Sequence, residues 1–330
     1  MPSITNVGGS VTSALALTLL AWGFRLFRAA ALRSDAAKKA HAKHASRKMS
    51  RFAAHLSPAS LRLLVESDPF PHTIVDIRPT GAKDPLPDCL KESTAIPVRE
   101  LEAALTPRKG NWQEAVGSEP PSPESTLVFV GDSQQDVKEA AVIAAACGYQ
   151  KCLLFGGDFS DFDMDASLAP KKMLSRDATA ALLGLVGPAG VCVDACVLDL
   201  RRHDERALYG CIPGTKHLPV DQIPAAMEME DEAWKKVYGF PKPGVGDVVV
   251  MQCRTNRRAA WAAQVCADHG YKSCFVYKSG AYGWRLDPSV KAYASYEMGE
   301  CPPEPEPFGL EVPDPAATAK ELIELGLMRL

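Results

Sequence analysis

Short apolar runs, many of them rich in β-branched residues, alternate along this chain with longer stretches of helical pattern. The clearest runs are 73–77, 126–130, 152–155, 247–252 and 274–277. Strands that are buried on both faces and separated by helices form a parallel sheet with helices packed against it. The pattern therefore predicts the α/β class, with parallel sheets covered by helices.

The sequence also repeats itself. Three short segments of the first half, TIVDIR, TAIPV and CGY, have the counterparts CVLDLR, KHLPV and HGY, which follow 122 or 123 residues later. A constant spacing over three markers indicates two copies of one domain, which we place at 55–165 and 172–300. We expect residues 301–330 to form a proline-rich tail with a short helix over 316–328, docked on a domain or bound to a partner.

Charge separates the N-terminal segment, residues 1–54, from the rest of the chain. Residues 1–52 contain nine Lys or Arg and one acid, whereas the whole chain has 37 basic and 40 acidic residues and a formal net charge of −3. Residues 7–24 carry no charge, which is close to the shortest length that spans a bilayer as a helix. Three interpretations stay open: a mitochondrial leader, a membrane anchor, and a helix that lies in the membrane interface.

These features indicate a location and exclude some partners. We expect a mitochondrial protein, associated with the inner membrane if residues 7–31 contact a membrane or a membrane complex. The overall charge provides no basic field for nucleic acid. Ten cysteines in 330 residues, none in CxxC spacing, are too sparse for a disulfide scaffold, and no histidine has the spacing of a metal ligand. We therefore expect neither a metal nor a cofactor.

One cysteine stands where chemistry is expected. The apolar run before loop 253–258 leads directly into Cys253, and a helical stretch follows the loop. Open α/β sheets bind ligands at the carboxyl ends of their strands, and the first N–H groups of a helix, together with its dipole, stabilise an anion there. Arg254, Arg257 and Arg258 add positive charge. We therefore expect Cys253 to be a thiolate nucleophile at neutral pH, open to small anions.

The second copy resembles the rhodanese-like sulfurtransferases in their tandem two-domain form. The motifs that carry the resemblance are VLDLR at 197–201 with the following Glu205, YGCIPG at 209–214, the loop 253–258, and residues 280–284. What the resemblance implies is a five-stranded parallel sheet in each domain, with Cys253 as the sulfur-carrying residue held by the loop amides. The resemblance extends over nearly the whole chain after residue 55.

The resemblance also implies an activity and roles for residues. Cys253 takes a sulfane sulfur from a donor such as thiosulfate, carries it as a persulfide and passes it to a thiol or cyanide acceptor. The other loop residues are expected to bind the small sulfur-containing anion: Arg254, Thr255, Asn256, Arg257 and Arg258. Asp199 and Arg201 resemble the structural pair of the family beneath the site.

The sequence departs from the family pattern at three positions. Asn256 stands where the loop usually has Gly; because Asn tolerates the left-handed conformation better than other non-Gly residues, we expect the loop to close. Cys211 replaces a usual His. In the first copy Asp132 occupies the cysteine position, so we interpret that copy as structural or regulatory.

Two other functions compete with sulfur transfer. Phosphatase and arsenate-reductase sites need Cys-x5-Arg to surround a tetrahedral oxyanion, one residue more than the loop between Cys253 and Arg258 has. A non-catalytic accessory subunit of a mitochondrial membrane complex is the alternative from another class. It is motivated by the first copy, which has no cysteine at the loop, and by Asn256.

Overall fold

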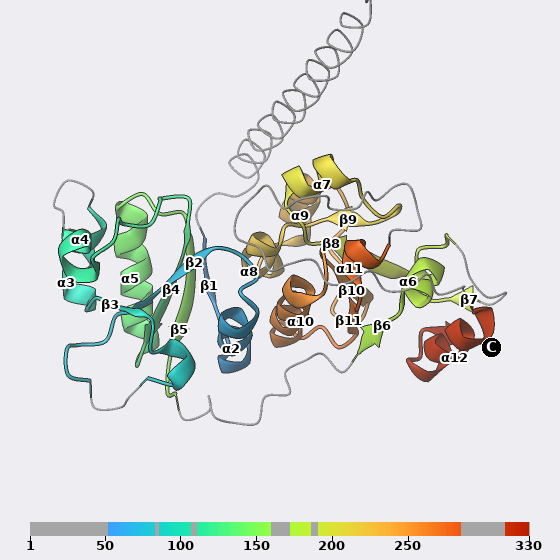
Figure 1. The fold of residues 1–330 in the computed structure, drawn as a ribbon, viewed down its shortest axis with the longest axis horizontal. Coiled ribbons are helices and arrows are strands. Elements are labelled where there is room, and N and C mark those ends of the chain that lie inside the picture. The colour runs from blue at the N-terminus through green and yellow to red at the C-terminus, as the bar shows by residue number, and fades with distance from the viewer. Residues whose placement is uncertain are drawn as a thin grey trace, which may run out of the picture.

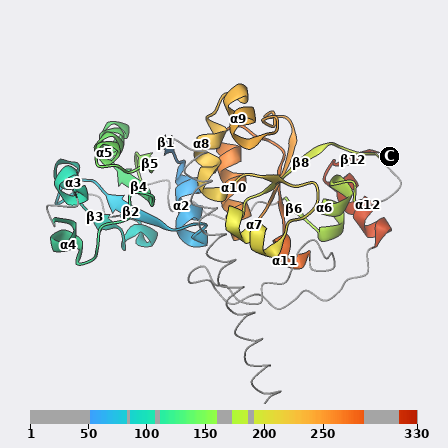
Figure 2. The same cartoon turned by 90° about the horizontal axis from the view of Figure 1, so that it is seen from above.

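The chain forms two α/β units that lie side by side, seen in Figure 1 and from above in Figure 2. The computed structural model describes residues 52–82, 86–106, 111–159, 172–185, 191–284 and 314–329. The leader or anchor predicted over 1–54 lies outside these residues except for its last three positions. Within the described part of the chain, no helix has the length and apolar character needed to cross a bilayer.

The first unit is built on a five-stranded parallel sheet of order β1-β5-β4-β2-β3. Its strands are β1 (Phe52–His55), β2 (His72–Asp76), β3 (Thr94–Ala95), β4 (Thr126–Gly131) and β5 (Lys151–Gly156). Its helices are α2 (Pro58–Ser67), the 3-10 helix η1 (Asp88–Leu90), α3 (Val98–Leu105), α4 (Asn111–Val116) and α5 (Gln134–Ala146). Helices α3, α4 and α5 cover one face of the sheet and α2 covers the other (Figure 1).

The second unit has a parallel sheet of the equivalent order, β6-β11-β10-β8-β9. Its strands are β6 (Met173–Leu174), β8 (Ala195–Asp199), β9 (Lys216–His217), β10 (Val248–Gln252) and β11 (Cys274–Tyr277). Its helices are α6 (Arg176–Leu182), α7 (His203–Tyr209), η3 (Val220–Gln222), α8 (Ile223–Met227), α9 (Asp231–Tyr238), α10 (Arg257–Asp268) and α11 (Gly280–Gly283). The α/β class predicted from the alternating pattern is therefore confirmed.

The C-terminal tail completes the second unit. Helix α12 (Pro315–Glu324) packs on α6 through Leu322, which is fully buried. The expected helix over 316–328 is too long, because Gly326 adopts a positive φ of 70° that ends it. Met328 then pairs with Cys192 in an antiparallel ladder between β12 (Met328–Arg329) and β7 (Val191–Cys192).

The two units share one apolar core. Helix α2 of the first unit lies beside α10 of the second in both views (Figures 1 and 2). Trp261 of α10 is fully buried there and donates from Nε1 to the Ser60 carbonyl at 3.0 Å, while its ring meets Phe70 edge-on at 5.1 Å. The Ser57 hydroxyl donates to Asp268 at 2.6 Å. The helix that follows the cysteine loop is thus held from the first unit.

Candidate active site

The strand that leads to Cys253 lies in the middle of the second sheet. β10 pairs with β8 on one side and with β11 on the other, and residues 249–252 are buried. Cys253 is the first residue after the strand, and α10 begins four residues later. The thiol therefore occupies the carboxyl edge of the sheet, where the sequence predicts it.

N–H groups of helix α11 donate hydrogen bonds to the carbonyl groups in the first half of the loop. The Cys253 carbonyl accepts from the N–H of Ala281 at 2.8 Å, and the Arg254 carbonyl accepts from the N–H of Tyr282 at 2.9 Å. Because C=O and N–H point in opposite directions across a trans peptide plane, the N–H groups of Arg254 and Thr255 point away from α11. The fold thereby leaves one side of the loop rich in N–H donors.

Gly280 makes this approach of α11 to the loop feasible. A Cβ atom at this position would lie 2.1 Å from the Thr255 carbonyl oxygen and 2.6 Å from those of Cys253 and Arg254. Gly280 also has a φ of 56°, a left-handed conformation that costs little without a side chain. Any larger residue at position 280 must displace the loop.

The helix N-termini after the two loops differ. In the first unit the Ser133 hydroxyl caps α5 by accepting from the N–H of Asp136 at 3.1 Å, and Asp136 itself adds negative charge to the first turn. In the second unit Asn256 makes no side-chain cap on α10, and the first turn of α10 contains no acid. The N-terminus of α10 therefore keeps its capacity to stabilise an anion.

Asn256 does not adopt the left-handed conformation that the sequence analysis expects. Its φ is −145°, and its side-chain amide donates to the Lys278 carbonyl at 3.1 Å. The expectation is wrong because the loop closes with a negative φ and a ψ of −11° at this position, while the positive φ is located across the loop at Gly280. Replacement of the usual Gly by Asn is thus compatible with this loop conformation.

Arg258 is held by a buried carboxylate rather than directed at solvent. Its two terminal nitrogens donate to the two oxygens of Glu205 at 2.6 and 2.8 Å, and the Glu205 side chain is fully buried. Burial alone would raise the pKa of Glu205, but the charge of Arg258 and its hydrogen bonds outweigh burial, and the pKa falls to about 2. The pair joins the first turn of α10 to the first turn of α7.

Asp199 and Arg201 form the pair that the resemblance implies. Arg201 donates from Nη2 to Asp199 at 2.8 Å and from the same nitrogen to the Gly210 carbonyl at 2.9 Å. Burial opposes ionisation of Asp199, but the charge and hydrogen bonds of Arg201 hold its pKa below the ordinary value. The bond to Gly210 fixes the start of the segment that contains Cys211 beside the strand ends.

The remaining loop residues differ in exposure. Arg254 is 5% exposed, Thr255 is half-buried and Arg257 is exposed. Segments 199–206 and 253–258 together contain six arginines and three carboxylates. This surplus of positive charge at the strand ends favours an anion at the loop.

Cys253 is less accessible than the sequence analysis expects. The residue is 1% exposed and belongs to the apolar core shared by the two units. The expectation of an open thiol is wrong for this conformation, because the loop and its supporting helices close over the strand end. A sulfur donor can reach Cys253 only if side chains around the loop move.

The first unit lacks the cysteine and has a shorter loop, with two residues between β4 and α5 against four between β10 and α10. The expectation that Asp132 occupies the cysteine position is wrong, because Asp76 pairs with Val130 as Asp199 pairs with Gln252, and this register matches Gly131 with Cys253. Asp132 lies 3.6 Å from Arg78 Nη1, and Arg78 also pairs with Asp76 at 3.0 Å in the manner of the Asp199 pair. A Cβ on Gly156 would meet the Ser133 carbonyl oxygen at 2.4 Å. Gly156 ends β5, so a strand residue lies against this loop, whereas Gly280 of α11 lies against the loop of the second unit.

The other described cysteines differ in burial: Cys152, Cys266 and Cys274 are buried, Cys147, Cys196 and Cys211 are half-buried, and Cys89 is exposed. Burial raises the pKa of Cys152 to about 12 and that of Cys196 to about 11, so both remain thiols at neutral pH. Among the described residues, no group of three or more His, Cys, Asp or Glu side chains is arranged to hold a metal ion.

Sequence reasoning missed two supporting residues. It noted Glu205 without assigning it a partner, because 53 residues separate it from Arg258. It also gave Gly280 no role, since only the folded chain brings α11 against the loop carbonyls. A Glu in the first turn of a helix that follows a strand end gives no signal of a long-range partner.

Comparison with known proteins agrees with this geometry. The rhodanese-like domain family matches residues 187–287, which include the whole loop. A provisional mitochondrial thiosulfate sulfurtransferase of Schizosaccharomyces pombe is 38% identical over 88 residues, which are 27% of this chain and 61% of that protein. The human thiosulfate:glutathione sulfurtransferase is 34% identical over 89 residues, which are 27% of this chain and 76% of that protein.

One solved structure aligns with part of this chain. The human single-domain sulfurtransferase is 26% identical, and the alignment covers 36% of this chain and all of that chain with a TM-score of 0.32. The sequence match with the human thiosulfate:glutathione sulfurtransferase extends over three quarters of that relative, and the domain match contains the loop. The chain belongs to the rhodanese-like domain family.

Proposed function

We propose that this protein is a sulfurtransferase that moves a sulfane sulfur from a donor such as thiosulfate to a thiophilic acceptor through a Cys253 persulfide. The observation that carries the proposal is the position of Cys253 before the N-terminus of α10, which has no side-chain cap and no acid in its first turn. N–H groups and positive charge at this point stabilise both a thiolate and a persulfide anion.

The reaction proceeds by two displacements. The Cys253 thiolate attacks the outer sulfur of thiosulfate; a sulfur–sulfur bond forms to the cysteine, and the bond to the sulfonate sulfur breaks with release of sulfite. A thiolate or cyanide then attacks the terminal sulfur and leaves Cys253 as a thiolate again. This is covalent catalysis with one negative charge kept on the cysteine at each stage.

The loop residues divide between binding and support. Arg257 and the N–H groups of Arg254 and Thr255 attract and orient the donor anion. Arg258 acts through Glu205, because its guanidinium is already engaged in two hydrogen bonds with that carboxylate. The short loop, with four residues between Cys253 and Arg258, favours sulfur over the larger phosphate or arsenate.

Transfer requires the loop to admit the donor, because Cys253 is 1% exposed. The half-buried Thr255 and Asn256 and the exposed Arg257 form the outer part of the loop. We place the entry route there, since the opposite side is packed against α11.

The experiment is a steady-state assay of sulfur transfer from thiosulfate to cyanide and to glutathione, with the full chain and with Cys253→Ser. Cys266→Ser is the matched control, because Cys266 is an equally buried cysteine of the same unit. The proposal predicts activity that is lost in Cys253→Ser and retained in Cys266→Ser. Equal rates in the full chain and in Cys253→Ser would remove Cys253 from the mechanism.

The proposal also covers the role of the first unit and the location of the protein in the cell. The matching sheet order of the first unit supports a second rhodanese-like domain, without a cysteine at its loop and with a structural or regulatory role. The name of the fission yeast relative and the basic segment 1–54 support a mitochondrial location.

A second candidate function is favoured by one observation. The 1% exposure of Cys253 fits a non-catalytic accessory subunit of a mitochondrial membrane complex, in which the loop never opens. Absence of transfer in the assay above, together with resistance of Cys253 to alkylation in the folded protein, would support this candidate.

A further inference from the structure

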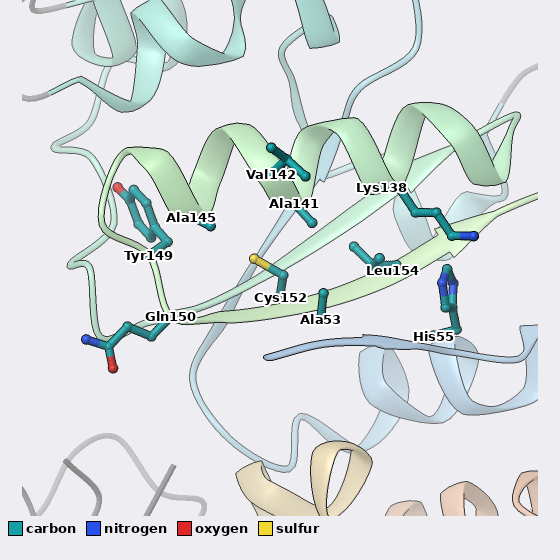
Figure 3. A pocket seen from close by; sticks show the side chains of 10 residues that line it. All are labelled: Ala53, His55, Lys138, Ala141, Val142, Ala145, Tyr149, Gln150, Cys152 and Leu154. Atoms are coloured by element: carbon teal, nitrogen blue, oxygen red, sulfur yellow. The ribbon is translucent and has the colours of Figure 1, made fainter. Parts of the chain in front are cut away.

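The first unit has a surface groove that the proposed chemistry does not use. It lies between α5 and the edge strand β1 and has a volume of about 390 Å³ (Figure 3). Its apolar lining is contributed by α5 on one side and by β1 and β5 on the other: Ala53, Ala141, Val142, Ala145, Cys152 and Leu154. The size is within the range of small-molecule sites.

Part of the apolar lining is open to solvent: Ala53 and Val142 are exposed, whereas Ala141, Cys152 and Leu154 are buried. Val142 is 70% exposed, more than any other large apolar residue in the described part of the chain. The alanines at 141 and 145 leave space beside α5, and Cys152 adds no charge, because burial raises its pKa to about 12. A ligand that covers this wall would remove apolar surface from water, which is favourable.

The two ends of the groove differ in chemistry. Figure 3 shows Lys138 and His55 at one end, and Tyr149 with Gln150 at the other. The Tyr149 hydroxyl is directed at the Pro121 carbonyl, to which it donates at 2.8 Å. Among the described lining residues there is a lysine and no carboxylate, so one end of an apolar groove carries positive charge.

The groove lies directly behind the contact between the two units. Along β1, Ala53 and His55 face the groove, whereas Ala54 and Leu56 are buried in the core shared with the second unit. The chain then enters α2, where Ser57 donates to Asp268 of the helix that follows the cysteine loop. A ligand in the groove therefore contacts the strand that supports α10.

We propose that this groove binds an amphipathic carboxylate, with its alkyl chain along Ala53, Val142 and Ala145 and its carboxylate at Lys138. The opposite charges of the carboxylate and the ε-ammonium select this orientation. Lys138 is exposed, and the described groove lining that includes it contains no carboxylate, so its ammonium is available to a ligand. The site is independent of the Cys253 thiol and goes beyond sulfur transfer.

The experiment is titration calorimetry of the full chain with decanoate below its micellar concentration, with 1-decanol as the uncharged probe. Val142→Glu places a like charge on the apolar wall, and Lys138→Gln removes the ammonium. Both residues are exposed, so neither change disturbs the core. Val245→Glu is the matched control, because Val245 is 55% exposed in the second unit.

Decanoate is expected to bind with one site per chain, about tenfold or more weakly in Val142→Glu and Lys138→Gln, and unchanged in Val245→Glu. Decanol is expected to bind more weakly than decanoate. Cys253→Ser should bind decanoate as the unaltered protein does, which separates this site from the proposed activity. Equal binding by all variants would overturn the proposal.

Two other occupants give distinct results. If sedimentation shows a dimer that Val142→Glu dissociates, while decanoate does not bind, the groove joins two copies of this chain. If decanoate binds only after residues 1–51 are removed, those residues occupy the groove. Either result would overturn the proposal.

Discussion

The buried pair of Glu205 and Arg258 allows the account of the site to be tested through stability. Glu205→Gln keeps the size of the side chain and removes its charge, which leaves the Arg258 guanidinium, 13% exposed, without a compensating carboxylate. Removing one partner of a buried ion pair costs about 3–5 kcal/mol. The lowered pKa of Glu205, from 4.5 to about 2, corresponds to about 3 kcal/mol at about 1.4 kcal/mol per pKa unit.

The sign of the pH dependence follows from the lowered pKa. The stabilisation by ionised Glu205 is fully present above pH 4.5 and is lost as pH falls through 4.5 toward about 2, because the folded protein must then bind a proton. In Glu205→Gln this contribution is missing at every pH. The difference in unfolding free energy between the two proteins should therefore be about 3 kcal/mol at pH 7 and should shrink steadily below pH 4.5.

The assay is urea unfolding followed by tryptophan fluorescence at pH 7 and at several values between pH 5 and pH 2.5. Glu139→Gln is the control, because Glu139 is an exposed carboxylate on α5 and its loss should change stability by less than about 0.5 kcal/mol. A Glu205→Gln protein as stable as the unaltered protein at pH 7 would refute the reasoning. So would a difference of the same size at pH 7 and at pH 2.5.

Two further changes test the loop. Gly280→Ala places a Cβ 2.1 Å from the Thr255 carbonyl oxygen, so transfer from thiosulfate should fall at least about tenfold. The control, Gly326→Ala, is also at positive φ but has open space around it, and it should leave the rate unchanged. Equal rates in both variants would contradict the role of Gly280 in supporting the loop. Gly131→Cys, at the position that the strand register matches with Cys253, should transfer no sulfur in a Cys253→Ser background, because the helix that follows is already capped by Ser133 and carries Asp136. Recovered activity would show that capping does not distinguish the two loops.

The sequence was sufficient to predict the sheets and the position of the thiol. Buried parallel strands have continuous apolar runs, so the pattern gives β2, β4, β5, β10 and β11 within one or two residues. The position of Cys253 could be predicted because a strand end directly before a helix is a local feature of the sequence.

Long-range contacts could not be predicted in the same way. Glu205 and Arg258 come together only when α7 and α10 start at the same sheet edge, and Gly280 meets the loop carbonyls only after β11 has paired with β10. The burial of Cys253 has the same origin, since it depends on helices from distant segments. The conformation of Asn256 was missed because the loop also closes with a negative φ at this position.

The most direct measurement of the central claim is the intact mass of the protein after treatment with thiosulfate and removal of excess reagent, followed by peptide mapping. The account predicts a gain of one sulfur atom on the peptide that contains Cys253, no gain in Cys253→Ser, and loss of the added sulfur when cyanide is supplied. An unchanged mass in the unaltered protein, or the same gain in Cys253→Ser, would contradict it.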